Sequence, residues 1–262
     1  MGDEPRVIWE QEGYVATVTL SQPAKKNAIS WKMWSQLREA FERVATDPDV
    51  RCVVVTGAGG DFSTGADLSD AENLASSAFD VRDRMQVVNA AARAFFNCSV
   101  PTIAKVEGVA AGAMCNLALG CDLVVASTEA RFSEIFVKRG LTVDFGGSAV
   151  LTRALPMHKA KEFALFGEVI SAEAAHELGL VNRLYSTDEI DAVVKDLAER
   201  VAAMPPRAVA TIKENLNRAP SRTLDEVLDA EAEGQAMLYT SEDTREAVLA
   251  FIEKREPRFT GR

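Results

Sequence analysis

The sequence predicts an α/β fold that ends in a helical C-terminal quarter. Short β-rich runs alternate with amphipathic segments of helical period as far as Tyr185, and beyond this residue the pattern is helical only. With 262 residues, of which 47% are hydrophobic and 26% charged, the chain is long enough to bury one substantial core. These observations favour an α/β core with a helical appendage.

The first three predicted elements are a strand, a helix and a second strand. Residues 14–20 are β-rich and stop at a Ser-Gln-Pro turn. Ser30 suits the N-cap of a helix whose apolar face recurs at helical spacing, at Met33, Leu37, Phe41 and Val44. Residues 47–49 (Asp-Pro-Asp) end this helix, residues 51–56 form a buried strand, and the glycine-rich residues 57–60 turn out of it.

The alternation continues through the middle of the chain. Residues 71–97 have a helical pattern, and a strand (102–106), a helix (112–120) and another strand (122–126) follow. Residues 180–185 carry the last β signal. Helices are then expected to begin near Asp188, Arg207, Thr223 and Glu242. An apolar stripe on the third of them predicts an interface with the core or with another subunit, at Leu224, Val227, Leu228, Met237 and Leu238.

Composition and missing motifs exclude several classes of function. A net charge of −10 argues against a nucleic-acid partner or an anionic membrane surface. The apolar runs are shorter than the roughly 20 residues of a membrane helix, and the acidic start lacks a signal segment, so we expect a cytoplasmic protein. The four cysteines lack metal-like spacing and are expected to be reduced and buried.

Nucleotide cofactors, metals and histidine chemistry are also disfavoured. The glycines at 57–60 are not completed to GxGxxG, because Phe62 replaces the last glycine, and the chain has no GxxxxGK[ST] loop. His158 and His176 lie in charged helical contexts and are expected at the surface. They form no HExxH pair, so neither a zinc site nor a Ser/His/Asp triad is expected.

Two stretches of small residues, 62–68 and 108–114, each follow a strand-like run. Their backbone amides are free to face a ligand, and the second stretch opens a helix whose dipole adds positive potential. Either stretch alone also suits a glycine-rich turn that closes a βα unit. Taken together, they predict an oxyanion hole, in which two fixed N–H groups stabilise negative charge on a carbonyl oxygen.

The sequence resembles the crotonase (enoyl-CoA hydratase/isomerase) superfamily over nearly its whole length. The matching motifs occur in the same order and spacing, at residues 62–68 and 107–113 for the two oxyanion loops, then 116–122, 146–148, 172–181 and 251–259. The resemblance implies a ββα spiral core over residues 1–200 and a helical trimerisation region over residues 201–262. It also implies a homotrimer or dimer of trimers that acts on an acyl-CoA thioester in fatty-acid metabolism, with coenzyme A as part of the substrate and no separate cofactor.

The resemblance assigns the two oxyanion donors to the amides of Ala66 and Ala113. It also implies a substrate-binding set, made of Lys25, Lys26, Ala28, Thr64, Gly65, Asp67, Leu68 and Gly112, together with Phe251 and Lys254 from the same or a neighbouring subunit. Lys25 and Lys26 would supply the local basic patch that an anionic ligand of an acidic protein requires. Exposed lysines are often simply solvated, and Asp67 equally suits a helix cap.

The acid/base residue decides between the reactions of this superfamily. By resemblance, the two glutamates of hydratases align with Asn116 and Phe136, neither of which can take up a proton. Asp144 stands where a carboxylate occurs in the enoyl-CoA isomerase and ring-1,2-epoxyphenylacetyl-CoA isomerase branch. The resemblance therefore implies an isomerase in which Asp144 moves a proton from C2 to C4 of an enolate. The alternative for Asp144 is a turn residue before Gly146.

Other assignments stay open at this point. Glu134 is the leading rival acid/base residue and Glu72 a weaker one, and either would suit a hydratase or a thioester hydrolase that activates water. A non-catalytic acyl-CoA-binding protein is the third alternative. Several apolar side chains suit either an acyl pocket or the core, namely Phe79, Met85, Val88, Phe136 and Phe145.

Overall fold

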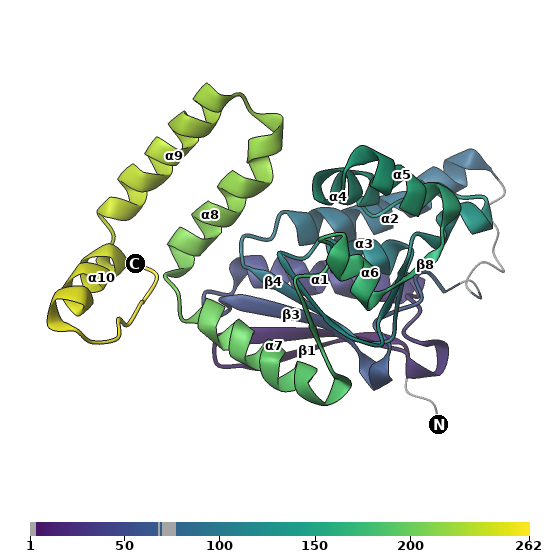
Figure 1. Ribbon diagram of the computed structural model, residues 1–262, viewed down its shortest axis with the longest axis horizontal. Helices are drawn as coiled ribbons and strands as arrows, with labels where there is room; N and C mark the ends of the chain where they lie inside the picture. Colours follow the sequence, from purple (N-terminus) through teal and green to yellow (C-terminus); the bar gives the residue numbers. More distant parts are fainter. Residues whose placement is uncertain (1–3, 68, 70–76) are drawn as a thin grey trace.

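The computed structural model describes residues 4–67, 69 and 77–262 (Figure 1). Leu68 and Glu72, which the sequence proposes for the site, lie outside the described residues. The fold is α/β, as predicted, and the chain ends in helices that extend away from the sheets (Figure 1).

A six-stranded sheet forms the centre of the core. Its strands follow the order β1 (Arg6–Glu12), β2 (Val15–Ser21), β3 (Cys52–Gly57), β4 (Thr102–Val106), β6 (Leu123–Ser127) and β9 (Arg183–Tyr185). Only β1 and β2 pair antiparallel. The sequence analysis missed β1, an edge strand whose short apolar run, residues 7–9, is only partly buried and is followed by exposed polar residues.

A second sheet of three strands supports one side of the site. It consists of β5 (Val109–Ala111), β7 (Arg131–Ser133) and β8 (Val169–Ser171), with β5 parallel to β7. The strands are short and were not predicted, since three residues are too few to show a period. β5 lies within the second small-residue stretch and leads through Gly112 into α3.

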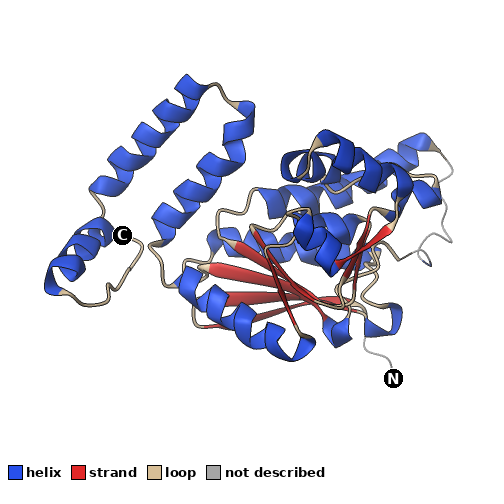
Figure 2. Ribbon diagram, viewed as in Figure 1, coloured by secondary structure: helices blue, strands red, loops and turns tan. Residues whose placement is uncertain are grey.

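Helices cover both faces of the large sheet (Figure 2). One face packs on α1 (Trp31–Thr46) and α2 (Ala78–Phe96), and the other on α7 (Thr187–Ala202). Ser30 caps α1 as predicted, because its Oγ accepts a hydrogen bond from the Met33 amide. The remaining core helices are α3 (Ala113–Leu119), α4 (Gly147–Ala154), α5 (Met157–Phe166) and α6 (Ala172–Glu177).

Three C-terminal helices stand apart from the sheets (Figure 1). They are α8 (Pro206–Arg218), α9 (Leu224–Tyr239) and α10 (Glu242–Glu253). Lys213 ties α8 to the core through an ion pair with Asp122 (2.7 Å). The apolar stripe predicted on α9 does not pack on the core, because Leu224 and Leu228 are exposed. The domain boundary predicted at residue 200 falls within the last turn of α7, which packs on the sheet.

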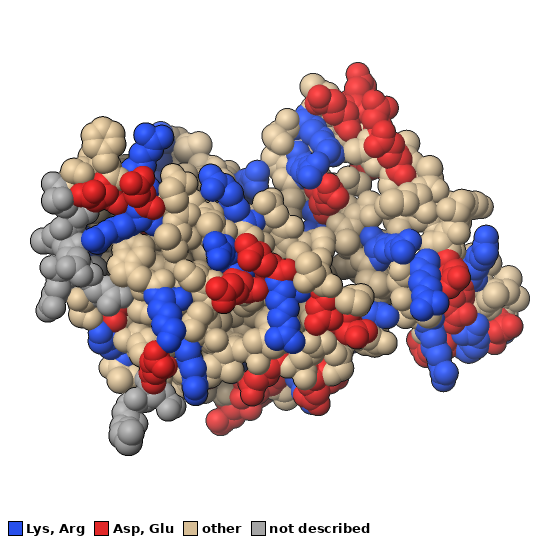
Figure 3. Space-filling view, turned by 180° about the vertical axis from the view of Figure 1, so that it is seen from behind, with Lys and Arg blue, Asp and Glu red and all other residues tan. Residues whose placement is uncertain are grey.

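The cysteine and histidine predictions are confirmed. All four cysteines are free and buried, and both histidines are exposed. Within the described ranges, no helix is long and apolar enough to cross a membrane, and no cluster of His, Cys, Asp or Glu is arranged to hold a metal ion. Basic and acidic side chains are interspersed over the face shown in Figure 3.

Candidate active site

The two small-residue loops lie against each other. The Ser63 amide donates to the Val109 carbonyl (2.8 Å), and the Ala111 amide donates back to the Ser63 carbonyl (2.9 Å). Gly65 has φ +91°, and a Cβ at this position would lie 2.9 Å from the Ala111 oxygen. Only glycine permits this close approach, so the structure brings together the loops that the sequence analysis paired.

The first loop leaves one backbone donor free. The Ile29 amide donates to the Gly65 carbonyl (2.8 Å), and the Asp67 amide donates to the Ile29 carbonyl (2.9 Å). These bonds fix the chain on both sides of Ala66. The Ala66 amide has no acceptor among the described residues, and Ala66 is exposed. It is therefore available to a ligand.

Asn27 fixes this loop and was not singled out from the sequence. Its side chain is fully buried, and its Nδ2 donates to the carbonyls of Ala58 (2.7 Å) and Asp61 (2.6 Å). Its Oδ1 accepts from the Gln22 amide (2.9 Å), and its carbonyl accepts from Ser63 Oγ (2.6 Å). The one local signal is that Asn tolerates a positive φ, here +56°.

The second loop ends at the N-terminus of α3. The Gly112 amide donates to the Ser133 carbonyl (2.9 Å), and Gly112 has φ +58°. Ala113 follows as the first helical residue, so its amide has no acceptor within the helix, and the glycine cap has no side chain to supply one. Ala113 is buried, which strengthens any hydrogen bond to a developing negative charge.

A buried polar cluster lies beside this helix terminus, and we call Asn116, Glu134 and Asp144 the proton cluster. Asn116 follows Ala113 by three positions, so both lie on one face of α3. Its Nδ2 donates to the Asp144 carbonyl (3.0 Å) and makes a long contact with Glu134 Oε2 (3.5 Å). Asn116 and Glu134 are fully buried, whereas Asp144 is partly exposed.

Both carboxyl groups of the proton cluster hold protons unusually strongly. Burial raises the pKa of Glu134 to about 7, and the nearby charge of Asp144 contributes to the increase. Burial alone raises the pKa of Asp144 to about 6. Carboxyl groups in this range exchange protons readily near neutral pH, as a general acid or base must.

A strained turn presents Asp144. Phe145 has φ +49° and Gly146 has φ +77°, so two successive residues adopt the left-handed region. The Phe145 ring is fully buried and packs near Trp34, with ring centroids 5.6 Å apart. Phe145 thus belongs to the core, as do Phe136 and Val88, whereas Phe79 is exposed. Packing of the ring compensates for the backbone strain and fixes the loop.

The predicted basic patch consists of lysines that are paired with carboxylates. Lys25 forms an ion pair with Asp67 (2.7 Å), and Lys26 forms one with Asp61 (3.4 Å). Although burial acts to raise the pKa of Asp67, hydrogen bonds from Lys25, Ser69 and Gln22 lower it to about 2. Both lysines keep substantial exposure. We call these two lysines and two aspartates the anchor cluster.

Two predicted substrate-binding residues lie far from the loops within one chain. Phe251 belongs to α10 and Lys254 caps this helix, which lies beyond α8 and α9 and well away from α3 in the core (Figure 1). Phe251 is 85% exposed, so it is free to contact another molecule. Ala28, by contrast, is buried next to the first loop.

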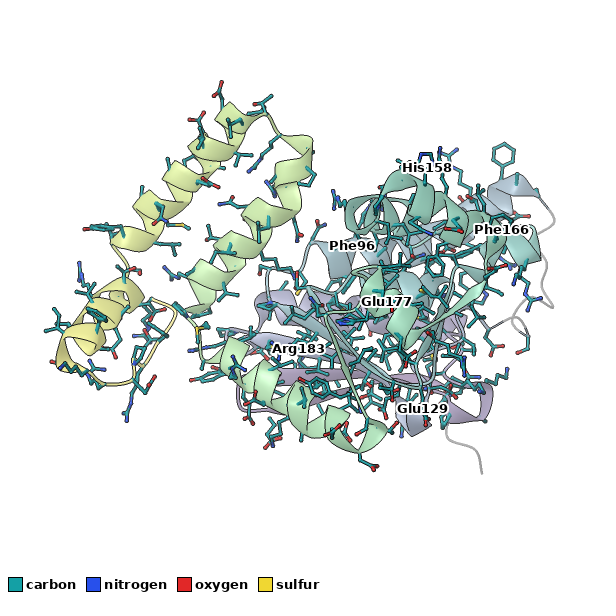
Figure 4. The ribbon with its side chains drawn as sticks, viewed as in Figure 1. Phe96, Glu129, His158, Phe166, Glu177 and Arg183 are labelled. Carbon is teal, nitrogen blue, oxygen red and sulfur yellow. The ribbon has the colours of Figure 1, made fainter. Side chains whose placement is uncertain are left out.

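Two cavities lie away from this site. One of about 220 Å³ lies between the large sheet and α7, and Lys105 and Asp191 contribute to its wall. The other, about 680 Å³, lies between α8 and α4, beside Phe96, which is labelled in Figure 4. Neither cavity is lined by Ala66, Ala113 or Asp144. The candidate site therefore rests on the backbone donors and the proton cluster.

Residues 10–262 match the protein family described as enoyl-CoA hydratase/isomerase. The chain belongs to this family. The 1,2-epoxyphenylacetyl-CoA isomerase of Escherichia coli K12 is 37% identical over 98% of both chains, and the short-chain-enoyl-CoA hydratase of Clostridium acetobutylicum is 33% identical over 95% of both. The crystal structure of an enoyl-CoA hydratase from Polaromonas sp. JS666 has a TM-score of 0.92 and 34% identity, and the match covers 97% of this chain and 100% of that one.

Membership in this crotonase superfamily confirms the predicted fold class and makes the protein an acyl-CoA enzyme. Relatives of similar identity have names for different reactions, an isomerisation in one case and a hydration in the other. The comparison therefore establishes the class of enzyme, and the choice of reaction depends on the residues of the site.

Proposed function

We propose that this acyl-CoA enzyme is an isomerase of the Δ3,Δ2-enoyl-CoA type or of a related double-bond or ring rearrangement. The substrate thioester oxygen accepts hydrogen bonds from the Ala66 and Ala113 amides. The Asp144 carboxylate removes a proton from C2, which leaves a dienolate, and the resulting carboxylic acid returns a proton at C4. The product has the same atoms as the substrate, so the reaction consumes no water.

One observation carries this proposal. Asp144 is the partly exposed carboxyl group of the proton cluster, whereas the positions that resemble the hydratase glutamates are Asn116 and Phe136. The raised pKa of Asp144, about 6, supports the role, because the group is ionised at neutral pH and is still basic enough to hold a proton. Each oxyanion donor of this kind typically contributes on the order of 10²–10³ in rate.

Coenzyme A binding and assembly form part of the same proposal. Lys25 and Lys26 retain exposed ammonium groups near the first loop, where they would contact the phosphates of coenzyme A. Phe251 and Lys254 would contribute only from a neighbouring subunit, because α10 lies far from the loops of its own chain. The exposed apolar residues of α9 support assembly as a homotrimer or dimer of trimers.

Hydration is the second candidate, and one observation favours it. Glu134 Oε1 is buried without a hydrogen-bond partner, and a bound water would supply one. A relative at 33% identity is named a short-chain-enoyl-CoA hydratase. Against hydration, Glu134 is fully buried, whereas Asp144 is partly exposed.

A panel of thioesters separates the candidates. The purified protein is incubated with 3-enoyl-, 2-enoyl- and saturated acyl-CoA substrates, and the products are identified by mass. The isomerase converts a 3-enoyl thioester into the 2-enoyl thioester of equal mass. A product heavier by one water identifies a hydratase, and release of free coenzyme A with the acid identifies a thioester hydrolase. Binding without turnover across the panel would favour a non-catalytic acyl-CoA-binding protein.

A further inference from the structure

Three buried oxygen atoms of the proton cluster have no hydrogen-bond partner. They are Asn116 Oδ1, Glu134 Oε1 and Asp144 Oδ1. No lysine, arginine or histidine of the described ranges forms an ion pair with either carboxyl group or contributes to its pKa. A buried carboxylate without a cation or a strong donor is costly, and two of them side by side are more so. Within the described ranges, the groups that donate to Glu134 are the Asn116 amide and the Cys115 thiol, and no cation offsets a charge on it.

We propose that Glu134 is a neutral positioning residue that acts through Asn116 to fix the loop carrying Asp144. This inference rests on the proposed role of Asp144 as the base. Asn116 Nδ2 links Glu134 to the loop that carries Asp144, because it contacts Glu134 Oε2 (3.5 Å) and donates to the Asp144 carbonyl (3.0 Å). A proton on Glu134 removes a buried negative charge that no cation of the described ranges compensates, and it turns an unpaired oxygen into a hydroxyl donor.

The position of Glu134 in the fold suits this role. It directly follows Ser133, whose carbonyl accepts from the Gly112 amide (2.9 Å) at the second loop. One short segment therefore touches both the oxyanion loop and, through Asn116, the loop that carries the base. Space is tight on the other side of Asn116 as well, because a Cβ on Gly147 would overlap its amide. The Asn116 side chain thus has little freedom, and its hydrogen bonds determine where Asp144 sits.

The charge state of Glu134 should respond to that of Asp144. The groups that face Glu134 are the Asn116 amide and the Cys115 thiol of α3 and the Asp144 carboxyl group of the next loop. Of these, only Asp144 is ionised near neutral pH, and its charge helps to hold a proton on Glu134. Two carboxyl groups that interact in this way titrate as a pair, with the first proton lost mainly from one and the second at higher pH.

Titration of the whole protein tests the inference without a substrate. The band of a neutral carboxylic acid is followed by infrared spectroscopy against pH in the wild type, Glu134→Gln and Asp144→Asn. We expect a neutral acid that persists above pH 6 in the wild type and is missing in Glu134→Gln. Asp144→Asn leaves Glu134 itself unchanged. In this variant the midpoint of the Glu134 titration should fall by on the order of one pH unit. A Glu134 that titrates with an ordinary pKa, or a midpoint that Asp144→Asn leaves unmoved, would overturn the inference.

The pH profile of kcat/KM then links the cluster to turnover. Ionisation of Glu134 should lower wild-type activity on the alkaline side, and Glu134→Gln should remove this alkaline limb while it keeps the acid limb. Glu129→Gln, which removes an exposed carboxylate between β6 and β7 (labelled in Figure 4), is the matched control and should leave both limbs unchanged. A residue with a merely structural role would scale the whole profile without changing its shape, and that result would refute the proposal.

The two readouts distinguish failure of this inference from failure of the proposed function. If the titrations of Glu134 and Asp144 are linked but Asp144→Asn retains full turnover, the coupling between the two groups stands and Asp144 is not the base. If Asp144→Asn is inactive but the titrations are independent, Asp144 keeps its role and the positioning role of Glu134 is lost.

Discussion

The anchor cluster and the proton cluster each contain a carboxyl group with little exposure to solvent, but the two groups behave in opposite ways. Asp67 is 9% exposed and Glu134 is fully buried, yet the pKa of Asp67 falls to about 2 while that of Glu134 rises to about 7. Asp67 accepts hydrogen bonds from Lys25, Gln22 and Ser69, whereas Glu134 has a long contact with the Asn116 amide and a weak donor in the Cys115 thiol. Hydrogen-bond donors therefore outweigh the effect of burial on the pKa of Asp67, whereas burial outweighs the donors at Glu134.

The largest expected effect separates the two clusters by turnover. Asp144→Asn removes the proposed base and should lower kcat by about 10²–10⁴ while substrate binding is retained. The matched change Asp67→Asn should lower kcat much less, because it weakens a loop anchor and removes no proton carrier. Steady-state kinetics with a 3-enoyl-CoA substrate measure both. An unchanged kcat in Asp144→Asn would remove this residue from the mechanism.

The next prediction concerns the contact between the two small-residue loops, where Gly65 lies against the Ala111 carbonyl. Gly65→Ala places a Cβ against the Ala111 carbonyl and should displace the Ala66 amide, with a loss on the order of 10² in kcat/KM. Gly140→Ala is the control, because Gly140 also has a positive φ (+67°) but has nothing within 4 Å of its Cβ. Equal losses in the two variants would mean that backbone strain, and not the loop contact, causes the effect.

The contribution of a carboxyl group to the free energy of unfolding should change with pH in opposite directions in the two clusters. The folded-state pKa of Glu134 is raised, so its favourable contribution is present below pH 4.5 and is lost as the pH rises through about 7. Relative to the wild type, Glu134→Gln should therefore be more stable at pH 8 than at pH 5, by on the order of 2–3 kcal/mol. Denaturant unfolding at the two pH values measures the difference.

Asp67→Asn should show the opposite dependence. The folded-state pKa of Asp67 is lowered, so its stabilisation is present above pH 3.8 and is lost as the pH falls toward about 2. We expect Asp67→Asn to cost about 1–3 kcal/mol at pH 7, where charge-assisted hydrogen bonds are lost, and less as the pH approaches 2. The same dependence in both variants would break the contrast between the clusters.

The smallest expected effect concerns the exposed lysines of the anchor cluster. Lys26→Gln should raise KM for an acyl-CoA substrate about threefold at low salt and less at high salt, since a single exposed phosphate contact is weak and screened. Lys195→Gln, an exposed lysine on α7, provides the control. A KM that is independent of salt in both the wild type and Lys26→Gln would leave Lys26 with only its ion pair to Asp61.

The pattern of neighbouring residues in the sequence was sufficient to predict much of the fold and to single out the two small-residue loops. Ser30 caps a helix through its own side chain, residues 102–106 form a strand of buried β-branched type, and Gly112 precedes a helix start. Each of these features depends on neighbours along the chain. The strand β1 was missed because its apolar residues are confined to positions 7–9, a run too short to show a period.

The sequence by itself determined the small residues of both loops, the absence of hydratase-like carboxylates at 116 and 136, and the presence of Asp144 and Glu134 nearby in the chain. Only the tertiary structure decided what surrounds each carboxyl group. Lys25 and Asp67, which form an ion pair, are 42 residues apart in the sequence, and Asn116 is 28 residues from Asp144, to whose carbonyl it donates. Solvation and hydrogen-bond donors come from such distant segments, and these two quantities determine a pKa. The sequence therefore identified the carboxyl groups of the site. The fold decided that the pKa of Asp67 is lowered and that those of Glu134 and Asp144 are raised.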